Sequence, residues 1–214
     1  MPVYNDKVSG YIEDLFAAED EALRWARLDS RDHGLPEINV RAEEGRFLQV
    51  LVRACGARRA VEIGSLGGYS GIWLARGLAP DGWLISLEKE PERARLAREH
   101  LAAAGLSDRV EVRVGEALEL LERLSVEGPF DFVFIDADKT GYPAYFDWAL
   151  KFTRLGGVIA AHNAFRKGSV VGLAEPDEWT EIMQAFNQHV ASEPRVLSTI
   201  YPAGDGTLVA VKIR

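Results

Sequence analysis

Two groups of polar side chains stand where apolar runs of the sequence end. Asp136, Asp138 and Lys139 follow the run "FDFVFI", and His162 and Asn163 follow the run "GGVIAA". A carboxylate, an imidazole and an amide oxygen are all competent ligands for a divalent metal. If the ends of these two runs adjoin, the sequence predicts one pocket in which Asp136, His162 and Asn163 face a common ligand such as a divalent metal.

A glycine-rich segment, "EIGSLGGYSG" (62–71), follows another apolar run. Its glycine spacing is not the dinucleotide pattern G-x-G-x-x-G, but such glycines let the backbone approach a ligand closely and begin a helix. Glu88 ends the next apolar run, and an acid about 20 residues beyond such a loop can hold both hydroxyls of a ribose. The two features predict an adenosine-type ligand, either a dinucleotide or S-adenosylmethionine.

Short β-rich runs alternate with helical runs through the middle of the chain. The expected strands are 58–64, 82–88, 109–115, 130–137 and 156–163, and the expected helices between them are 91–105, 115–124 and 142–155. This alternation predicts an α/β fold with a parallel sheet. Several of the strands are nearly continuous apolar segments, which is typical of strands covered on both faces. Ligands of such sheets bind beyond the carboxyl ends of the strands, where the polar groups above stand.

The two ends of the chain break this alternation. Residues 195–213 predict two strands joined by a Gly-Asp-Gly turn, so the last strand should run antiparallel. Two helical stretches, 11–29 and 41–56, precede the first strand and are joined by the loop "HGLPEINV". The length of 214 residues fits one domain.

Composition narrows the class of protein. The net charge is -8, with a pI near 5.1, which argues against a general nucleic-acid binder. The one cysteine, Cys55, cannot form an internal disulfide, and this favours a cytoplasmic protein. The N-terminus has no signal-peptide pattern, and no apolar run approaches the roughly 20 residues that span a bilayer.

Five ordered motifs carry a resemblance to a known family: "PEINVRAEEGRFL", "VEIGSLGGYSGIWLA", "FDFVFIDADKTGYPAY", "LGGVIAAHNAF" and "YPAGDGTLVAVK". The chain resembles the class I S-adenosylmethionine-dependent O-methyltransferases of the catechol and caffeoyl-CoA type, in particular small bacterial members. The resemblance extends from about Leu35 to the C-terminus. It implies a Rossmann-like class I methyltransferase fold with a seven-stranded, mostly parallel sheet, an antiparallel last strand and helices on both faces. It also implies a single domain over 1–214, with a helical part, 1–55, that covers the active site.

The resemblance assigns roles to particular residues. The cofactor-binding residues would be Val40, Glu62, Gly64, Ser65, Ser70, Glu88, Ala117, Asp136 and Asp138. Lys139 matches the lysine that takes the acceptor's hydroxyl proton, with Asp136 and His162 as further catalytic candidates. The metal ligands would be Asp136, His162 and Asn163.

One position departs from the family pattern, which usually has Asp-Asn where this chain has His162-Asn163. With His162, one negative charge is missing from the ligand set. Hard ions such as Mg²⁺ prefer oxygen ligands, whereas imidazole suits transition metals better. Three interpretations stay open: a site for a transition metal or for weakly bound Mn²⁺ or Mg²⁺, a site without metal in which His162 is a base or hydrogen-bond donor, and a strand-end residue without a role.

The leading hypothesis is methyl transfer from S-adenosylmethionine to a hydroxyl of a small catechol-like or phenylpropanoid-like acceptor. The alternatives are a tRNA-modifying O-methyltransferase, a nicotinamide-dependent oxidoreductase and a cofactor-binding protein without catalysis. The acidic pI disfavours the first, and the glycine spacing disfavours the second. We expect a homodimer, with no nucleic-acid or membrane partner.

Overall fold

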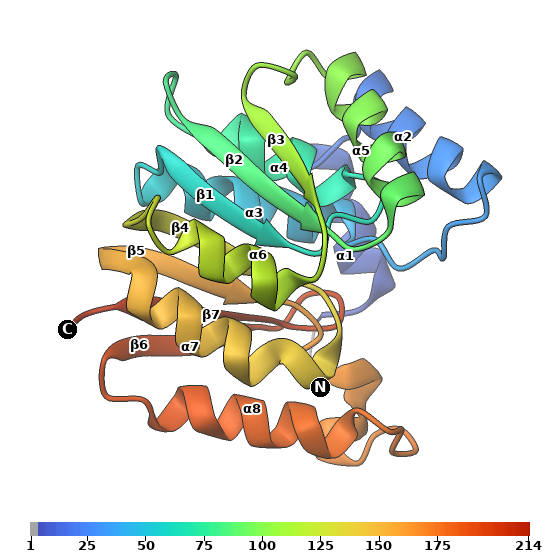
Figure 1. The fold of residues 1–214 in the computed structure, drawn as a ribbon. Helices are drawn as coiled ribbons and strands as arrows, with labels where there is room; N and C mark the ends of the chain where they lie inside the picture. Colours follow the sequence, from blue (N-terminus) through green and yellow to red (C-terminus); the bar gives the residue numbers. More distant parts are fainter. Residues whose placement is uncertain (1–3) are drawn as a thin grey trace.

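The computed structural model describes residues 4–214, so the first three residues of the predicted N-terminal helical part lie outside the described residues. One seven-stranded sheet runs through the molecule in the order β3-β2-β1-β4-β5-β7-β6 (Figure 1). The strands are β1 (Arg59–Ile63), β2 (Trp83–Glu88), β3 (Val110–Val114), β4 (Phe130–Ile135), β5 (Thr153–Ala161), β6 (Val196–Tyr201) and β7 (Thr207–Lys212).

The pairing of the strands confirms the predicted topology. β1 pairs in parallel with β2 and β4, β2 pairs in parallel with β3, and β4 pairs in parallel with β5. β7 is antiparallel to both of its neighbours, β5 and β6, as the Gly-Asp-Gly hairpin predicts. The carboxyl ends of the five parallel strands β1 to β5 therefore lie along one edge of the sheet.

Eight α-helices and two short 3₁₀ turns occur in the described part of the chain. They are α1 (Asp6–Phe16), α2 (Glu21–Asp32), α3 (Ala42–Ala54), α4 (Tyr69–Gly77), α5 (Pro91–Ala103), α6 (Ala117–Leu124), α7 (Tyr142–Phe152), α8 (Thr180–Ser192), η1 (Lys139–Gly141) and η2 (Arg166–Val171).

Two of the predicted helical stretches differ from the structure. The stretch 11–29 is not one helix, because Asp20 caps a new helix by accepting a hydrogen bond from the Leu23 amide at 3.0 Å. The stretch 142–155 ends as a helix at Phe152, and the chain continues directly as β5. In the first stretch a helix cap interrupts the helical pattern, and in the second the pairing of β5 with β4 ends it.

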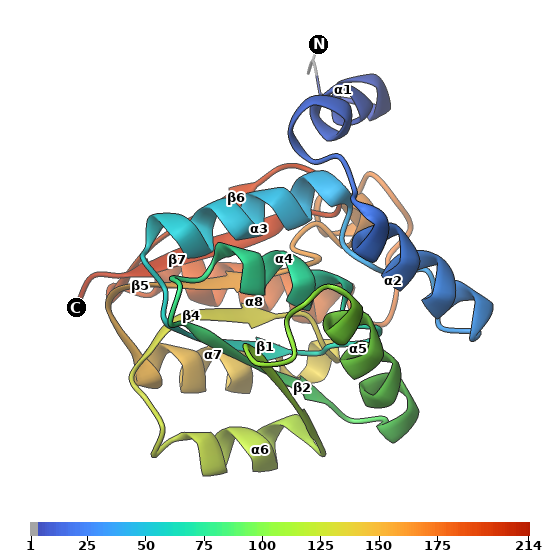
Figure 2. The same cartoon turned by 90° about the horizontal axis from the view of Figure 1, so that it is seen from above.

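The core lies in two layers, one on each face of the sheet. Alternate residues of β4 show this, because Phe132 and Phe134 pack into one layer while Val133 and Ile135 pack into the other. Helices α3, α4 and α5 cover the first face, and α6, α7 and α8 cover the second (Figure 2). Within residues 4–214, no helix has the length and apolar character needed to cross a membrane.

Candidate active site

A cavity of about 850 Å³ opens at the carboxyl ends of β1 to β5. Residues from both ends of the predicted site line it, and these include Val40, Gly64, Ser65, Ser70, Glu88, Ala117, Asp136, Asp138, Lys139, His162 and Asn163. The strand order explains this convergence, because β2, β1, β4 and β5 are consecutive neighbours in the sheet. Glu88, Gly64, Asp136 and His162 each stand at or just beyond the end of one of these strands.

Lys139 lines this cavity and is only 9% exposed. Its Nζ donates to the Tyr142 hydroxyl at 2.6 Å and to the Ala137 carbonyl at 3.0 Å, and it lies 3.4 Å from Asp136 Oδ1. Burial lowers the pKa of Lys139, and the nearby Asp136 carboxylate opposes this only in part. A lysine in this state is competent as a general base.

His162 lies between two carboxylates. Its Nε2 is 2.9 Å from Glu44 Oε1, and its Nδ1 is 3.3 Å from Asp136 Oδ2. Burial alone would lower the pKa of His162, but Asp136 and Glu44 outweigh burial and raise it to about 10. The pKa of Asp136 is lowered: burial would raise it, but His162 and Lys139 have the larger combined effect. His162 is thus a buried side chain held between two carboxylates and is not a frayed strand end.

Asn163 adopts a positive φ of 59° directly after His162. Its Nδ2 donates to Asp205 Oδ2 at 2.8 Å, and Asp205 lies in the turn between β6 and β7. The same aspartate accepts from the Lys167 amide, so the C-terminal hairpin holds the loop after β5 in place. The amide of Asn163 is therefore oriented by a residue of the last turn.

The glycine-rich turn and Glu88 form the other end of the cavity. Glu88 accepts hydrogen bonds from the Leu66 amide at 2.8 Å and from the Glu90 amide at 3.0 Å. These bonds fix its carboxylate against the turn. Ser65 has a buried hydroxyl without a hydrogen-bond partner in the described structure. A buried polar atom at a cavity wall calls for a partner, which a bound ligand can supply.

Comparison with known proteins decides the family. A family model described as O-methyltransferase matches residues 13–213. The chain belongs to the O-methyltransferase family. It is 40% identical to a catechol O-methyltransferase of Niastella koreensis over 91% of this chain and 89% of the relative. It is 41% identical to a catechol O-methyltransferase of Mycobacterium tuberculosis over 95% of this chain and 94% of the relative.

A solved structure of the same family gives the same fold. The O-methyltransferase from Bacillus cereus, in complex with SAH, superposes with a TM-score of 0.88 at 41% identity, covering 96% of this chain and 97% of that chain. The match confirms the Rossmann-like methyltransferase fold that the sequence predicts.

Glu62 is the one predicted cofactor residue of this O-methyltransferase that does not line the cavity. Its side chain is fully buried and accepts hydrogen bonds from Ser70 and Ser86, each at 2.5 Å. Burial raises its pKa to about 7, although the two hydroxyls work in the opposite direction. Glu62 therefore holds Ser70, which does line the cavity, from behind.

Two site residues escape the sequence analysis. Glu44 is 1% exposed, and its second oxygen accepts from the Arg41 amide at 2.9 Å, which caps α3. In the sequence, Asp205 is only the middle residue of the Gly-Asp-Gly turn, and nothing nearby indicates its contact with Asn163. Glu44 stands in the first turn of a helix, within the motif "PEINVRAEEGRFL". A glutamate at this position commonly caps the helix, so the sequence alone does not distinguish a capping residue from a site residue.

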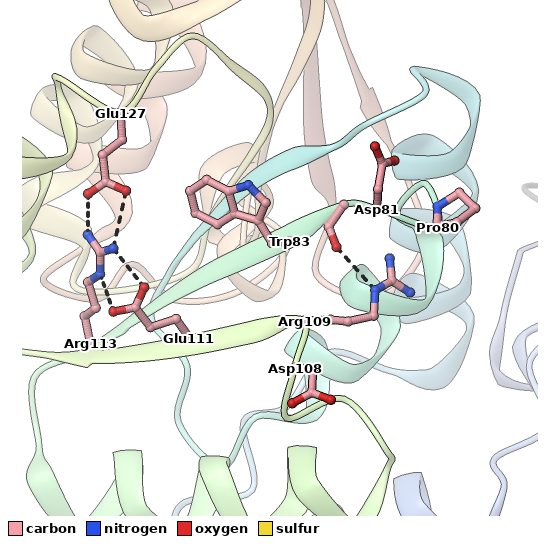
Figure 3. Close-up of a pocket in the computed structure, with 9 residues that line it drawn as sticks. Pro80, Asp81, Trp83, Asp108, Arg109, Glu111, Arg113 and Glu127 are labelled. Atoms are coloured by element: carbon pink, nitrogen blue, oxygen red, sulfur yellow. Dashed lines mark hydrogen bonds and ion pairs between the residues drawn. The ribbon is translucent and has the colours of Figure 1, made fainter.

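A second depression, of about 520 Å³, lies at the opposite, amino ends of β2 and β3. Figure 3 shows the Arg113 side chain directed at Glu111 and Glu127, while Arg109 donates to the Gly82 carbonyl. Both arginines are already paired in this hollow, and the carboxylates of Asp81 and Asp108 also line it. None of the predicted site residues lies there, whereas all of them except Glu62 line the larger cavity.

Proposed function

We propose that this O-methyltransferase transfers a methyl group from S-adenosylmethionine to one hydroxyl of a small vicinal diphenol, a catechol-like or phenylpropanoid-like acceptor. The observation that carries the proposal is that one cavity is lined by the glycine-rich turn, by Lys139 and by the Asp136, His162 and Asn163 group. Relatives named catechol O-methyltransferase at about two-fifths identity support the acceptor class.

The residues present fit the cofactor. Its sulfonium supplies an activated methyl group to an oxygen nucleophile. Glu88 would accept hydrogen bonds from the ribose hydroxyls, because two backbone amides already fix its carboxylate at the cavity wall. The unpaired hydroxyl of Ser65 would meet the polar amino-acid end. Val40 would close over the methionine part of the cofactor, and Ala117 would lie near the adenine, since both line the cavity.

Lys139 would take the proton of the reacting hydroxyl. A phenol has a pKa near that of tyrosine, about 10, so it is mostly neutral at neutral pH. Burial lowers the pKa of Lys139, which makes its neutral amine available. Tyr142 holds the amine at 2.6 Å, and holding reacting groups in place in this way can contribute several kcal/mol.

Asp136, His162 and Asn163 would hold a divalent metal beside the acceptor. Such an ion lowers the pKa of a bound hydroxyl and orients a vicinal diphenol. Within residues 4–214, no group of three or more His, Cys, Asp or Glu side chains is arranged to hold a metal. The set here has two such residues, and the third is the Asn163 amide.

A binding screen and a transfer assay test the proposal together. We expect S-adenosylmethionine and S-adenosylhomocysteine, but not NAD, to raise the melting temperature. We expect methyl transfer to vicinal diphenols, with a monophenol as the control acceptor and tRNA as the acceptor that tests the RNA-modifying alternative. Stabilisation by NAD alone, or transfer to tRNA without transfer to diphenols, would contradict the proposal. The predicted homodimer and cytoplasmic location stay predictions.

A further inference from the structure

The Glu44, His162 and Asp136 side chains contact one another in that order, and all three line the cavity. Glu44 lies behind the imidazole ring, on the side of α3, and Asp136 lies in front of it, at the end of β4. All three are held by further contacts: the Arg41 amide binds Glu44, Lys139 approaches the other oxygen of Asp136, and the His162 amide donates to the Ile135 carbonyl at 3.0 Å. The ring is therefore fixed in one orientation.

The two ring nitrogens of His162 differ in what they contact. Nε2 is within hydrogen-bond distance of Glu44, whereas Nδ1 is buried and has no aligned hydrogen-bond partner. Nδ1 faces Asp136 Oδ2 at 3.3 Å. Two ligands of one transition-metal ion lie about 3.0–3.4 Å apart, because each is about 2.0–2.2 Å from the ion. Metal-bound histidines commonly donate their other nitrogen to a carboxylate, as Nε2 can do here.

We propose that His162 Nδ1 and Asp136 bind a transition-metal ion, with Asn163 completing the protein ligands, and that Glu44 is the carboxylate that orients the imidazole. The inference deepens the proposed function, on which it rests. It places Glu44, which has no role in the resemblance, behind the metal site. The nitrogen ligand of the ion would also distinguish this chain from the family pattern, which has an aspartate at position 162.

Charge explains how the site tolerates the loss of a ligand carboxylate. The resemblance leads to an aspartate at position 162, which would contribute its negative charge directly to the ion. In this chain the second negative charge is that of Glu44, which contacts the imidazole ring of His162 and would not bind the ion directly. Nitrogen ligation shifts the preference of a site away from Mg²⁺ and Ca²⁺ and toward Zn²⁺, Co²⁺ and similar ions.

The first experiment measures metal binding directly, without an activity readout. Chelator-treated wild-type protein is titrated with Co²⁺ alone and with Mg²⁺ alone by calorimetry, and the visible absorption of Co²⁺ is followed. We expect one Co²⁺ per chain. In His162→Asp, which restores three oxygen ligands, we expect the ratio of Co²⁺ to Mg²⁺ affinity to fall at least about tenfold. The ratio is the diagnostic quantity, because most sites bind Co²⁺ more tightly than Mg²⁺.

Glu44→Gln tests the orienting role. Loss of such a partner typically costs about 10- to 100-fold in metal affinity, and we expect a weakening of Co²⁺ binding in this range. His189→Ala is the matched control, because His189 is exposed and lies outside the cavity. Its removal should leave Co²⁺ binding unchanged. Loss of the Co²⁺ signal in His189→Ala would show surface binding and would overturn the proposal.

The proposal and the proposed function fail in different ways. If wild-type protein binds no Co²⁺, or if His162→Asp leaves the ratio unchanged, the metal inference is overturned. If that protein still binds S-adenosylmethionine and methylates a diphenol after chelation, the proposed function stands. If S-adenosylmethionine does not bind at all, the proposed function fails whatever the metal result.

Discussion

Glu44 Oε1 lies 2.9 Å from His162 Nε2, although 118 positions of sequence separate the two residues. Glu44 lies in the first turn of α3, in the N-terminal helical part, and His162 directly follows the last residue of β5. Both side chains are almost completely buried, at 1% and 4% exposure. This contact joins the N-terminal helical part of the chain to the edge of the sheet where the parallel strands end and the cavity opens.

Gly204 allows that contact, and its replacement should disturb it. A Cβ at Gly204 would collide with the Glu44 carboxylate, and the residue also has a positive φ of 54°. We expect Gly204→Ala to lower the free energy of unfolding by more than the about 1–2 kcal/mol of left-handed strain alone, and to weaken Co²⁺ binding. Denaturant unfolding and calorimetry measure the two effects.

Gly34→Ala is the control for this substitution. Gly34 has a positive φ of 75°, but a Cβ there would meet nothing within 4 Å. Gly34→Ala should therefore lower the free energy of unfolding through left-handed strain alone and leave Co²⁺ binding unchanged. Equal effects of the two variants on metal binding would argue against a specific role of the Gly204 contact.

Lys139→Ala should lower kcat by about 10²–10⁴-fold, the usual contribution of a general base. Its affinity for S-adenosylhomocysteine, measured by calorimetry, should change little. In wild-type protein the rate should rise with pH as Lys139 loses its proton, and this rise should begin below the usual lysine range because burial lowers the pKa of Lys139. The variant should lose this limb of the profile and recover part of its rate with more acidic diphenols. A variant with an unaltered pH profile would exclude Lys139 as the base.

Glu88→Gln should weaken S-adenosylhomocysteine binding about 10- to 100-fold, because a hydrogen bond to a charged group is worth about 1.5–3 kcal/mol. Glu92→Gln is the control, since Glu92 is exposed on α5 and pairs only with Arg95. Calorimetric titration gives both dissociation constants. If the two variants bind equally well, Glu88 does not hold the ribose.

Glu62 should make the protein less stable as pH rises. Its folded pKa of about 7 lies above the ordinary value of 4.5, so between these values the folded state keeps a proton that the unfolded state has lost. The free energy of unfolding therefore falls from about pH 4.5 to about pH 7, by about 3 kcal/mol from this group, and then levels off. We expect Glu62→Gln to remove this dependence. Unfolding by urea at pH 5 and pH 8 measures it, and an equal loss of stability in both proteins would contradict the assignment.

Much of the fold could be predicted because it depends on local patterns. Each of the five predicted parallel strands exists. β2, β4 and β5 are nearly continuous apolar runs, which indicate buried strands, whereas β3 alternates and only its Val112 is buried. The position of Asp136 and His162 at the cavity follows from their place at strand ends. The division of 11–29 into two helices was missed, because the cap made by Asp20 competes with an unbroken helical pattern.

Local sequence patterns account for the alternation of strands and helices, the antiparallel hairpin at the end, and the identity of the residues that follow each strand. These features depend on neighbours a few positions apart, through backbone hydrogen bonding and the burial of one face. Three contacts become visible in the folded chain alone: Glu44 faces His162, Asp205 holds Asn163, and Glu62 turns away from the cavity toward Ser70 and Ser86. Each of these depends on elements that meet through packing of the whole sheet, because a buried carboxylate turns toward whichever donors the assembled core leaves within reach.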